Sequence, residues 1–122
     1  MFVFLNDMKK VYHLEKCSSC QRIIKEINWP YEKQEIRSEK ISEEQIDHMA
    51  KLAGSYQALF SKRAIKYRTL QLKDKPLSEQ DYKKLILSED TFLKRPVFII
   101  NNNIFIGNSK STTEDLKKAL NE

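Results

Sequence analysis

The two cysteines of this chain, Cys17 and Cys20, stand three positions apart, between an apolar alternation at Val11–Leu14 and a helical pattern at Ile23–Ile27. This order predicts a strand that delivers a C-x-x-C motif to the first turn of a helix. Free backbone N–H groups and the helix dipole stabilise a thiolate there, and the thiolate is the reactive form of cysteine. A second thiol one turn along can resolve a mixed disulfide formed by the first. The motif therefore indicates a redox catalyst, a redox switch or a pair of structural cysteines.

Composition favours a soluble globular protein with one domain, residues 1–122, because 40% of the residues are hydrophobic and 32% are charged. Apolar stretches such as Val97–Ile100 are far too short to cross a bilayer. Met1–Leu5 is apolar but has no basic leading segment, so it makes a poor signal peptide. We therefore expect a cytoplasmic protein without membrane contact. In a reducing compartment, a close cysteine pair is more often catalytic, regulatory or metal-binding than a structural disulfide.

A zinc site is not expected, since His13 precedes the cysteine pair, His48 falls on a predicted helix and no second histidine follows at the usual spacing. The net charge of +5 permits an anionic partner but does not require one. Most basic residues alternate with acidic ones, which is typical of a solvated surface. The stretch Lys62–Arg68 differs because it contains no acidic residue.

The beginning of the chain predicts a β-α-β unit. Met8–Leu14 reads as a strand, Ser19–Asn28 as a helix ended by Trp29-Pro30, and Tyr31–Arg37 as a polar edge strand. The preceding segment, Met1–Asp7, is either an added strand or a leader.

The middle and the end of the chain predict a helical block followed by a hairpin and a last helix. The helical block has four predicted helical segments. The first is capped by Ser42 and closed by Gly54, and the last, Glu79–Leu87, is capped by Ser78. Two shorter segments lie between them, at Tyr56–Phe60 and near Ala64–Tyr67. Asparagines join strands at Pro96–Ile100 and Ile104–Ile106, and Ser111 or Thr112 is expected to cap a helix at Glu114–Leu120. This order is the thioredoxin plan, an α/β fold of βαβ plus ββα around a mixed four-stranded sheet, with a helical insertion at about residues 41–90.

Lys94-Arg95-Pro96 is the second candidate site because it directly precedes the strand at Val97. Proline cannot donate to a sheet ladder, so a position at the start of a strand would by itself explain Pro96. The alternative is a cis Arg95–Pro96 bond facing the cysteines, with the guanidinium group directed at the thiolate. A fixed positive charge there would lower the pKa of the cysteine and bind an oxyanion through two hydrogen bonds.

Four segments together resemble the arsenate reductase (ArsC)/Spx family of thioredoxin-fold proteins: Tyr12–Arg22 with its C-S-S-C, Ala58–Arg63, Leu93–Val97 and Ile106-Gly107. The resemblance covers nearly all of Met8–Leu120. It implies a cis-proline at Pro96, a nucleophilic Cys17 and a helical subdomain between about Ile41 and Asp90.

The chain also departs from the glutathione-coupled arsenate reductases of this family. The resemblance implies further arginines at the positions of Ser61 and about Asn108, and Lys62 and Arg63 are candidate anion-binding substitutes for the first. Cys20 stands where those enzymes have no second thiol. The resulting C-x-x-C motif is similar to that of the Spx branch. Since each charge-assisted hydrogen bond contributes about 1.5–3 kcal/mol, losing two guanidinium groups should weaken oxyanion binding.

We expect a thiol–disulfide oxidoreductase without a bound cofactor, in which Cys17 attacks, Cys20 resolves and Arg95 stabilises the thiolate and a bound anion. Its substrate would be a small oxyanion such as arsenate or a disulfide, with glutathione or thioredoxin as electron donor. The alternative is an Spx-like redox-sensing regulator that binds the C-terminal domain of the RNA polymerase α-subunit, without direct nucleic-acid contact. Gly54 lies near the polymerase contact that the Spx resemblance implies, although a helix end explains it equally well. A third reading is a family member whose cysteines do no chemistry.

Overall fold

The computed structural model describes residues 8–121, so the predictions made for Met1–Asp7 lie outside the described residues. The chain forms two compact units. The first unit combines the described parts of Met1–Glu39 and Arg95–Glu122, and the second is Lys40–Lys94.

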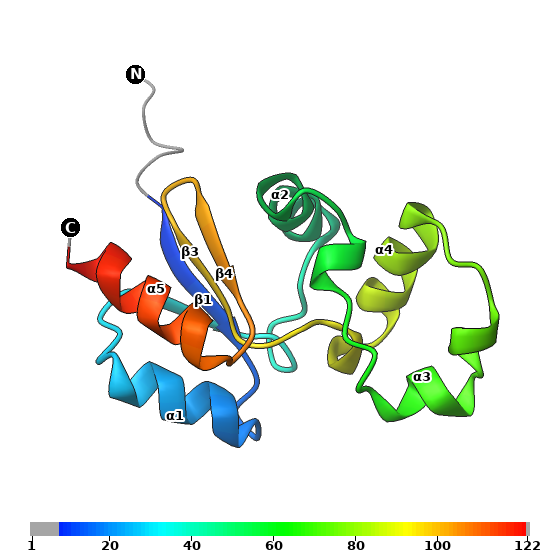
Figure 1. The fold of residues 1–122 in the computed structure, drawn as a ribbon, viewed down its shortest axis with the longest axis horizontal. Coiled ribbons are helices and arrows are strands. Elements are labelled where there is room, and N and C mark those ends of the chain that lie inside the picture. The colour runs from blue at the N-terminus through cyan, green and yellow to red at the C-terminus, as the bar shows by residue number, and fades with distance from the viewer. Residues whose placement is uncertain (1–7, 122) are drawn as a thin grey trace. The chain divides into compact units, whose positions relative to one another are not determined.

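The first unit contains a mixed four-stranded sheet, as the sequence predicts (Figure 1). The strand order is β2-β1-β3-β4. The strands are β1 (Lys9–His13), β2 (Glu32–Glu35), β3 (Val97–Ile100) and β4 (Asn103–Ile106). Strand β1 pairs in parallel with β2 and antiparallel with β3, and β3 and β4 form the predicted hairpin. The polar strand β2 is an edge strand, as expected from its sequence.

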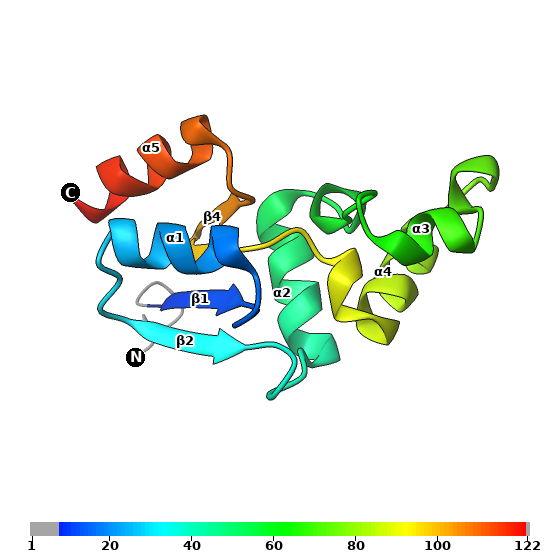
Figure 2. The same ribbon diagram turned by 90° about the horizontal axis from the view of Figure 1, so that it is seen from below.

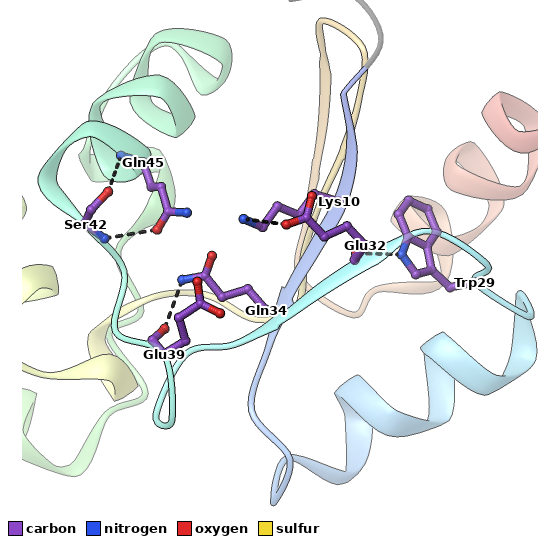
Figure 3. A network of polar contacts seen from close by, with 7 residues as sticks. All are labelled: Lys10, Trp29, Glu32, Gln34, Glu39, Ser42 and Gln45. Atoms are coloured by element: carbon purple, nitrogen blue, oxygen red, sulfur yellow. Dashed lines mark hydrogen bonds and ion pairs between the residues drawn. The ribbon is translucent and has the colours of Figure 1, made fainter.

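Two helices, α1 (Ser18–Glu26) and α5 (Lys110–Leu120), lie side by side on one face of this sheet (Figure 2). They pack on it through a buried cluster of apolar side chains: Val11, Ile23, Ile24, Trp29, Phe98, Ile100 and Leu116. The indole of Trp29 stands edge-on to Phe98, with ring centroids 5.0 Å apart, and its Nε1 donates to the carbonyl of Glu32 at 3.0 Å (Figure 3). This tryptophan therefore fixes the corner between α1 and β2.

Helix α1 ends at Glu26, two residues before the predicted end at Asn28. The backbone N–H of Trp29 donates to the carbonyl of Ile24 and that of Asn28 to the carbonyl of Lys25, each at 3.1 Å. Asn28 has a φ of 54°, so these bonds form a Schellman end with asparagine in the left-handed position. The end is set by Asn28, and Pro30 follows it.

The last helix begins earlier than predicted, at Lys110, and its N-cap is Ser109 and not Ser111 or Thr112. The Oγ of Ser109 accepts the backbone N–H of Thr112 at 3.1 Å. Several hydroxyl residues follow one another here, and each can act as a cap. Spacing alone therefore did not select the correct one.

The second unit contains α2 (Glu43–Ala53), α3 (Ile65–Thr69) and α4 (Glu79–Ser88). The predicted capping box at the start of α2 is confirmed, because Gln45 N–H donates to Ser42 Oγ at 3.1 Å and Ser42 N–H to Gln45 Oε1 at 3.0 Å (Figure 3). Gly54 ends α2 with a φ of 98°, a conformation that favours glycine. Ser78 begins α4 with a capping box of the same kind as that of Ser42, with Asp81 as its partner.

The helix predicted at Tyr56–Phe60 is wrong, because this segment makes only one 3₁₀ turn at Gln57–Leu59. Phe60 leaves the turn with extended backbone and pairs with Leu93 in an isolated bridge. Its ring stacks on Phe92, with centroids 5.1 Å apart. Tertiary contacts of this aromatic side chain thus end the turn before a helix can form.

Within residues 8–121, no helix combines the length and the apolar character needed to cross a bilayer.

Candidate active site

Cys17 occupies the N-cap of α1, where the chain turns from β1 into the helix. Its backbone N–H donates to the carbonyl of Leu14 at 3.0 Å, which fixes the turn. Its Sγ accepts the backbone N–H of Cys20 at 3.4 Å. The sulfur therefore takes the place that a serine or aspartate oxygen takes at an ordinary N-cap, facing the positive end of the helix.

Arg95 and Pro96 lie at the same end of the sheet as this turn. In the antiparallel pairing of β1 with β3, Tyr12 is opposite Val97, so the residues just before β3 lie where β1 ends. The Arg95–Pro96 bond is cis, as expected. The carbonyl of Pro96 accepts the backbone N–H of Gly107 at 2.9 Å, which connects this segment to the end of β4.

The surroundings of the two thiols move their pKa values in opposite directions. Burial raises the pKa of Cys17, but hydrogen bonds from Cys20 and the charge and hydrogen bond of Arg95 outweigh it, so the pKa of Cys17 is lowered. Burial and the hydrogen bond to Cys17 raise the pKa of Cys20 to about 12. Cys17, which is partly exposed, therefore loses its proton before Cys20, which is a buried thiol.

The structure brings together four of the residues that the sequence singled out: Cys17, Cys20, Arg95 and Pro96. Lys62 and Arg63 belong to the second unit, where they are exposed in the turn before α3. The backbone N–H of Arg63 donates to Ser61 Oγ at 3.3 Å. Anion binding by Lys62 and Arg63 stays a prediction.

Gln21, which the sequence analysis did not single out, holds the turn before Cys17 from the side of the helix. Its Nε2 lies 2.9 Å from the carbonyl of Leu14, to which it donates, and 3.0 Å from Nδ1 of His13. Burial lowers the pKa of His13, so its ring is neutral near neutral pH. The signal in the sequence is the position of Gln21, one turn after the nucleophile candidate.

Glu35, also missed from the sequence, holds the same turn from the side of the sheet. Its Oε2 accepts the backbone N–H of Glu15 at 2.8 Å, and its Oε1 accepts those of Arg37 at 3.0 Å and Ser38 at 2.7 Å. These backbone hydrogen bonds, that of Glu15 first, lower the pKa of Glu35 to about 2. An acidic residue at the end of a parallel edge strand was the available signal.

A cavity of about 440 Å³ lies between α1 and α5 in the first unit. Asn108, at one of the positions where the family resemblance implies an arginine, lies on its wall, and three cationic side chains also line it: Arg22, Lys110 and Lys117. Glu26 and Glu114 line it too, and the Glu26 carboxylate lies 2.7 Å from Lys117 Nζ and 3.7 Å from Arg22 Nη1, so the positive charge is partly neutralised. Across residues 8–121, no group of three or more His, Cys, Asp or Glu side chains could hold a metal ion.

Comparison with known proteins places this site in a family. Residues 12–116 match the model of the ArsC family. Among solved structures, a possible arsenate reductase from Streptococcus mutans is 27% identical with a TM-score of 0.70, and the match covers 91% of this chain and 98% of that one. An arsenate reductase from Vibrio cholerae shares the fold at 17% identity with a TM-score of 0.71, over 91% of this chain and 98% of that one.

A comparison with curated proteins gave no match. The family match spans both cysteines, Arg95 and Pro96, and it supports a thiol redox protein. The architecture agrees with it, since the mixed sheet and its helices are those of the thioredoxin-like solved structures. The chain belongs to the ArsC family.

Proposed function

We propose that this protein is a thiol–disulfide oxidoreductase in which Cys17 is the nucleophile and Cys20 the resolving cysteine. The observation that carries the proposal is the placement of the two thiols: Cys17 Sγ is partly exposed at the N-cap of α1 and accepts the Cys20 N–H at 3.4 Å, while Cys20 is buried. This placement lowers the pKa of Cys17 and raises that of Cys20. In such a pair, the thiol with the lower pKa attacks the substrate, and the other thiol reacts later to resolve the mixed disulfide.

The reaction with a disulfide substrate follows from this difference. The Cys17 thiolate attacks one sulfur of the substrate, a new S–S bond forms, and the other substrate sulfur leaves as a thiolate and takes up a proton. Cys20 then loses its proton and attacks Cys17 Sγ, which releases the second substrate sulfur as a thiol. The substrate gains two electrons, and the Cys17–Cys20 pair is oxidised to a disulfide. An external dithiol or glutathione must reduce that disulfide before the next turnover.

Arg95 has two roles in this proposal. Its positive charge and hydrogen bond favour the thiolate form of Cys17. The same guanidinium group would hold one end of an oxyanion such as arsenate, a substrate that the printed names of similar structures suggest. The cationic side chains that line the cavity beside Asn108, on α1 and α5, offer a second candidate surface for an anion in the same unit.

The Spx-like regulator stays a prediction from the resemblance. The left-handed conformation of Gly54 at the end of α2 accounts for that glycine without a partner protein. Among residues 8–121, no contact favours polymerase binding over catalysis.

Two measurements test the proposed function. The rate of iodoacetamide alkylation of Cys17 against pH should show a thiol pKa below the ordinary value of about 8.5. A coupled assay with arsenate or a small disulfide, supplied with glutathione or with thioredoxin and its reductase, should show turnover that Cys17→Ser abolishes. An ordinary pKa of Cys17 together with no turnover on either substrate class would contradict the proposal.

A further inference from the structure

Glu35 makes an unusual use of its side chain, because both carboxylate oxygens accept hydrogen bonds from backbone N–H groups. The Oε1 atom accepts from Arg37 and Ser38, and so closes the turn after β2. The Oε2 atom accepts from Glu15, twenty residues earlier in the chain, at 2.8 Å. One carboxylate thus joins the turn after β2 to the turn after β1.

The second of these turns leads directly to Cys17. Glu35 ends β2 and His13 ends β1, and the two are partners in the parallel pairing. The backbone N–H of Ile36 donates to the carbonyl of His13 at 2.9 Å, so the ladder continues to the last residue of β1. From that position the Glu35 side chain reaches Glu15, and only Lys16 separates Glu15 from Cys17.

The turn after β1 is therefore held at two consecutive residues, Leu14 and Glu15, by side chains from two different elements. On the helix side, the carbonyl of Leu14 accepts Gln21 Nε2 and the backbone N–H of Cys17. On the sheet side, the N–H of Glu15 is bound by Glu35. Position matters here, because the hydrogen bond between the Cys20 N–H and Cys17 Sγ, 3.4 Å long, weakens if the sulfur moves away.

We propose that Glu35 is a positioning residue for Cys17: by binding the N–H of Glu15 it fixes the turn that sets the Cys17 sulfur against the Cys20 N–H and Arg95. This inference rests on the proposed function, in which Cys17 is the nucleophile. Glu35 touches neither the sulfur nor a substrate in this role. It acts through the backbone of the turn.

A positioning role and a purely electrostatic role predict opposite results. A carboxylate near a thiolate disfavours the thiolate, so removing its charge would lower the pKa of Cys17 or leave it unchanged. Loss of the anchor weakens the contacts of Cys17 with Cys20 and Arg95, and so raises the pKa of Cys17. Other charges near this end of the sheet include those of Glu15 and Lys33, which act with Glu35 on His13, and Arg95, which acts on Cys17. Lys16 and Arg37 carry further charges in the turns after β1 and β2. They stay in place in the variants below.

The test compares Glu35→Gln, Glu35→Asp and the control Glu39→Gln with the wild-type protein. Glu35→Gln removes the charge and one strong acceptor, whereas Glu35→Asp keeps the charge but shortens the reach to Glu15. Glu39 is an exposed glutamate a few residues further along the same turn. The measurement is the pH profile of iodoacetamide alkylation of Cys17, located by mass spectrometry, with circular dichroism and thermal unfolding to confirm that each variant is folded.

We expect both Glu35 variants to shift the alkylation profile to higher pH and to slow alkylation at pH 6.5 by about three- to tenfold, with Glu39→Gln unchanged. If one Glu35 variant fails to fold, the other carries the test. A wild-type profile shifted below the ordinary range, combined with unchanged or lower profiles in folded Glu35 variants, overturns the positioning role and leaves the proposed function standing. An ordinary profile in the wild-type protein overturns both.

Discussion

The backbone N–H of Cys20 points at the sulfur of Cys17, with 3.4 Å between the two atoms. Through this contact the first residue of the C-x-x-C motif caps the helix that carries the second. The cap lowers the pKa of Cys17, whereas Cys20, whose side chain is fully buried, has a pKa raised to about 12. The spacing of the motif thus produces two thiols with different reactivity from one helix end.

This difference predicts the stoichiometry of the reaction with an aromatic disulfide such as 5,5′-dithiobis(2-nitrobenzoate). The wild-type protein should release about two thiol equivalents, one from the attack of Cys17 and one when Cys20 resolves the mixed disulfide. Cys20→Ser should release about one equivalent and keep the other half of the reagent attached. Cys17→Ser should react slowly, because the remaining thiol is buried and protonated. Fast, complete reaction of Cys17→Ser would assign the attacking role to Cys20 instead.

Arg95 is the second determinant of the charge on Cys17, and Arg95→Gln should raise the pKa of Cys17. Since an opposite charge at a partly exposed site contributes on the order of 1 kcal/mol, the alkylation rate at pH 6.5 should fall by about fivefold. Lys94→Gln is the matched control, because it removes a positive charge from the exposed neighbouring residue. Equal effects of the two substitutions would show that net charge, and not the contact between Arg95 and Cys17, sets the pKa.

Much of this fold could be predicted because the sequence marks its turns and helix starts with distinctive residues. Ser42 and Ser78 begin their helices as predicted, since each has a capping partner three residues later. The predicted helix bounds were wrong where several residues could act as the cap, or where tertiary contacts outweighed the local sequence pattern. Several hydroxyl residues compete near Ser109, and the aromatic contacts of Phe60 shorten the turn at Gln57–Leu59.

Part of the candidate site could likewise be predicted from the sequence, and part could not. Cys17 and Arg95 lie together, as the cis-proline alternative expects, because β1 and β3 are antiparallel neighbours and the end of β1 lies beside the start of β3. The positions of Gln21 and Glu35 in the sequence were weak signals that do not specify what these side chains bind, since their hydrogen bonds go to backbone groups of a turn that only the folded chain creates. Side chains that bind the backbone carry no motif of their own, whereas reactive side chains do.

Glu35 also predicts a dependence of stability on acid. Its pKa is about 2 in the folded protein and about 4.3 in an unfolded chain. The stabilisation is therefore fully present above the unfolded value and is lost as the pH falls toward 2. After allowance for solvent screening, Glu35→Gln should cost about 1 kcal/mol of unfolding free energy at pH 7. Urea unfolding at pH 7 and pH 3 should show this difference shrinking in acid, and a constant difference would contradict the assignment.

The substitution Asn108→Arg tests whether the missing family arginine limits oxyanion binding. Asn108 directly follows Gly107, whose N–H donates to Pro96, and it shares a cavity wall with Arg22 and Lys110. A guanidinium group placed there would add a charge-assisted contact to an anion held near Arg95 and should lower the KM or Kd for arsenate about tenfold. Asn121→Arg, at the other end of α5, adds the same charge far from the site and should leave arsenate affinity unchanged. Equal affinities in the two variants and the wild-type protein would show that the missing arginine at position 108 does not limit oxyanion binding.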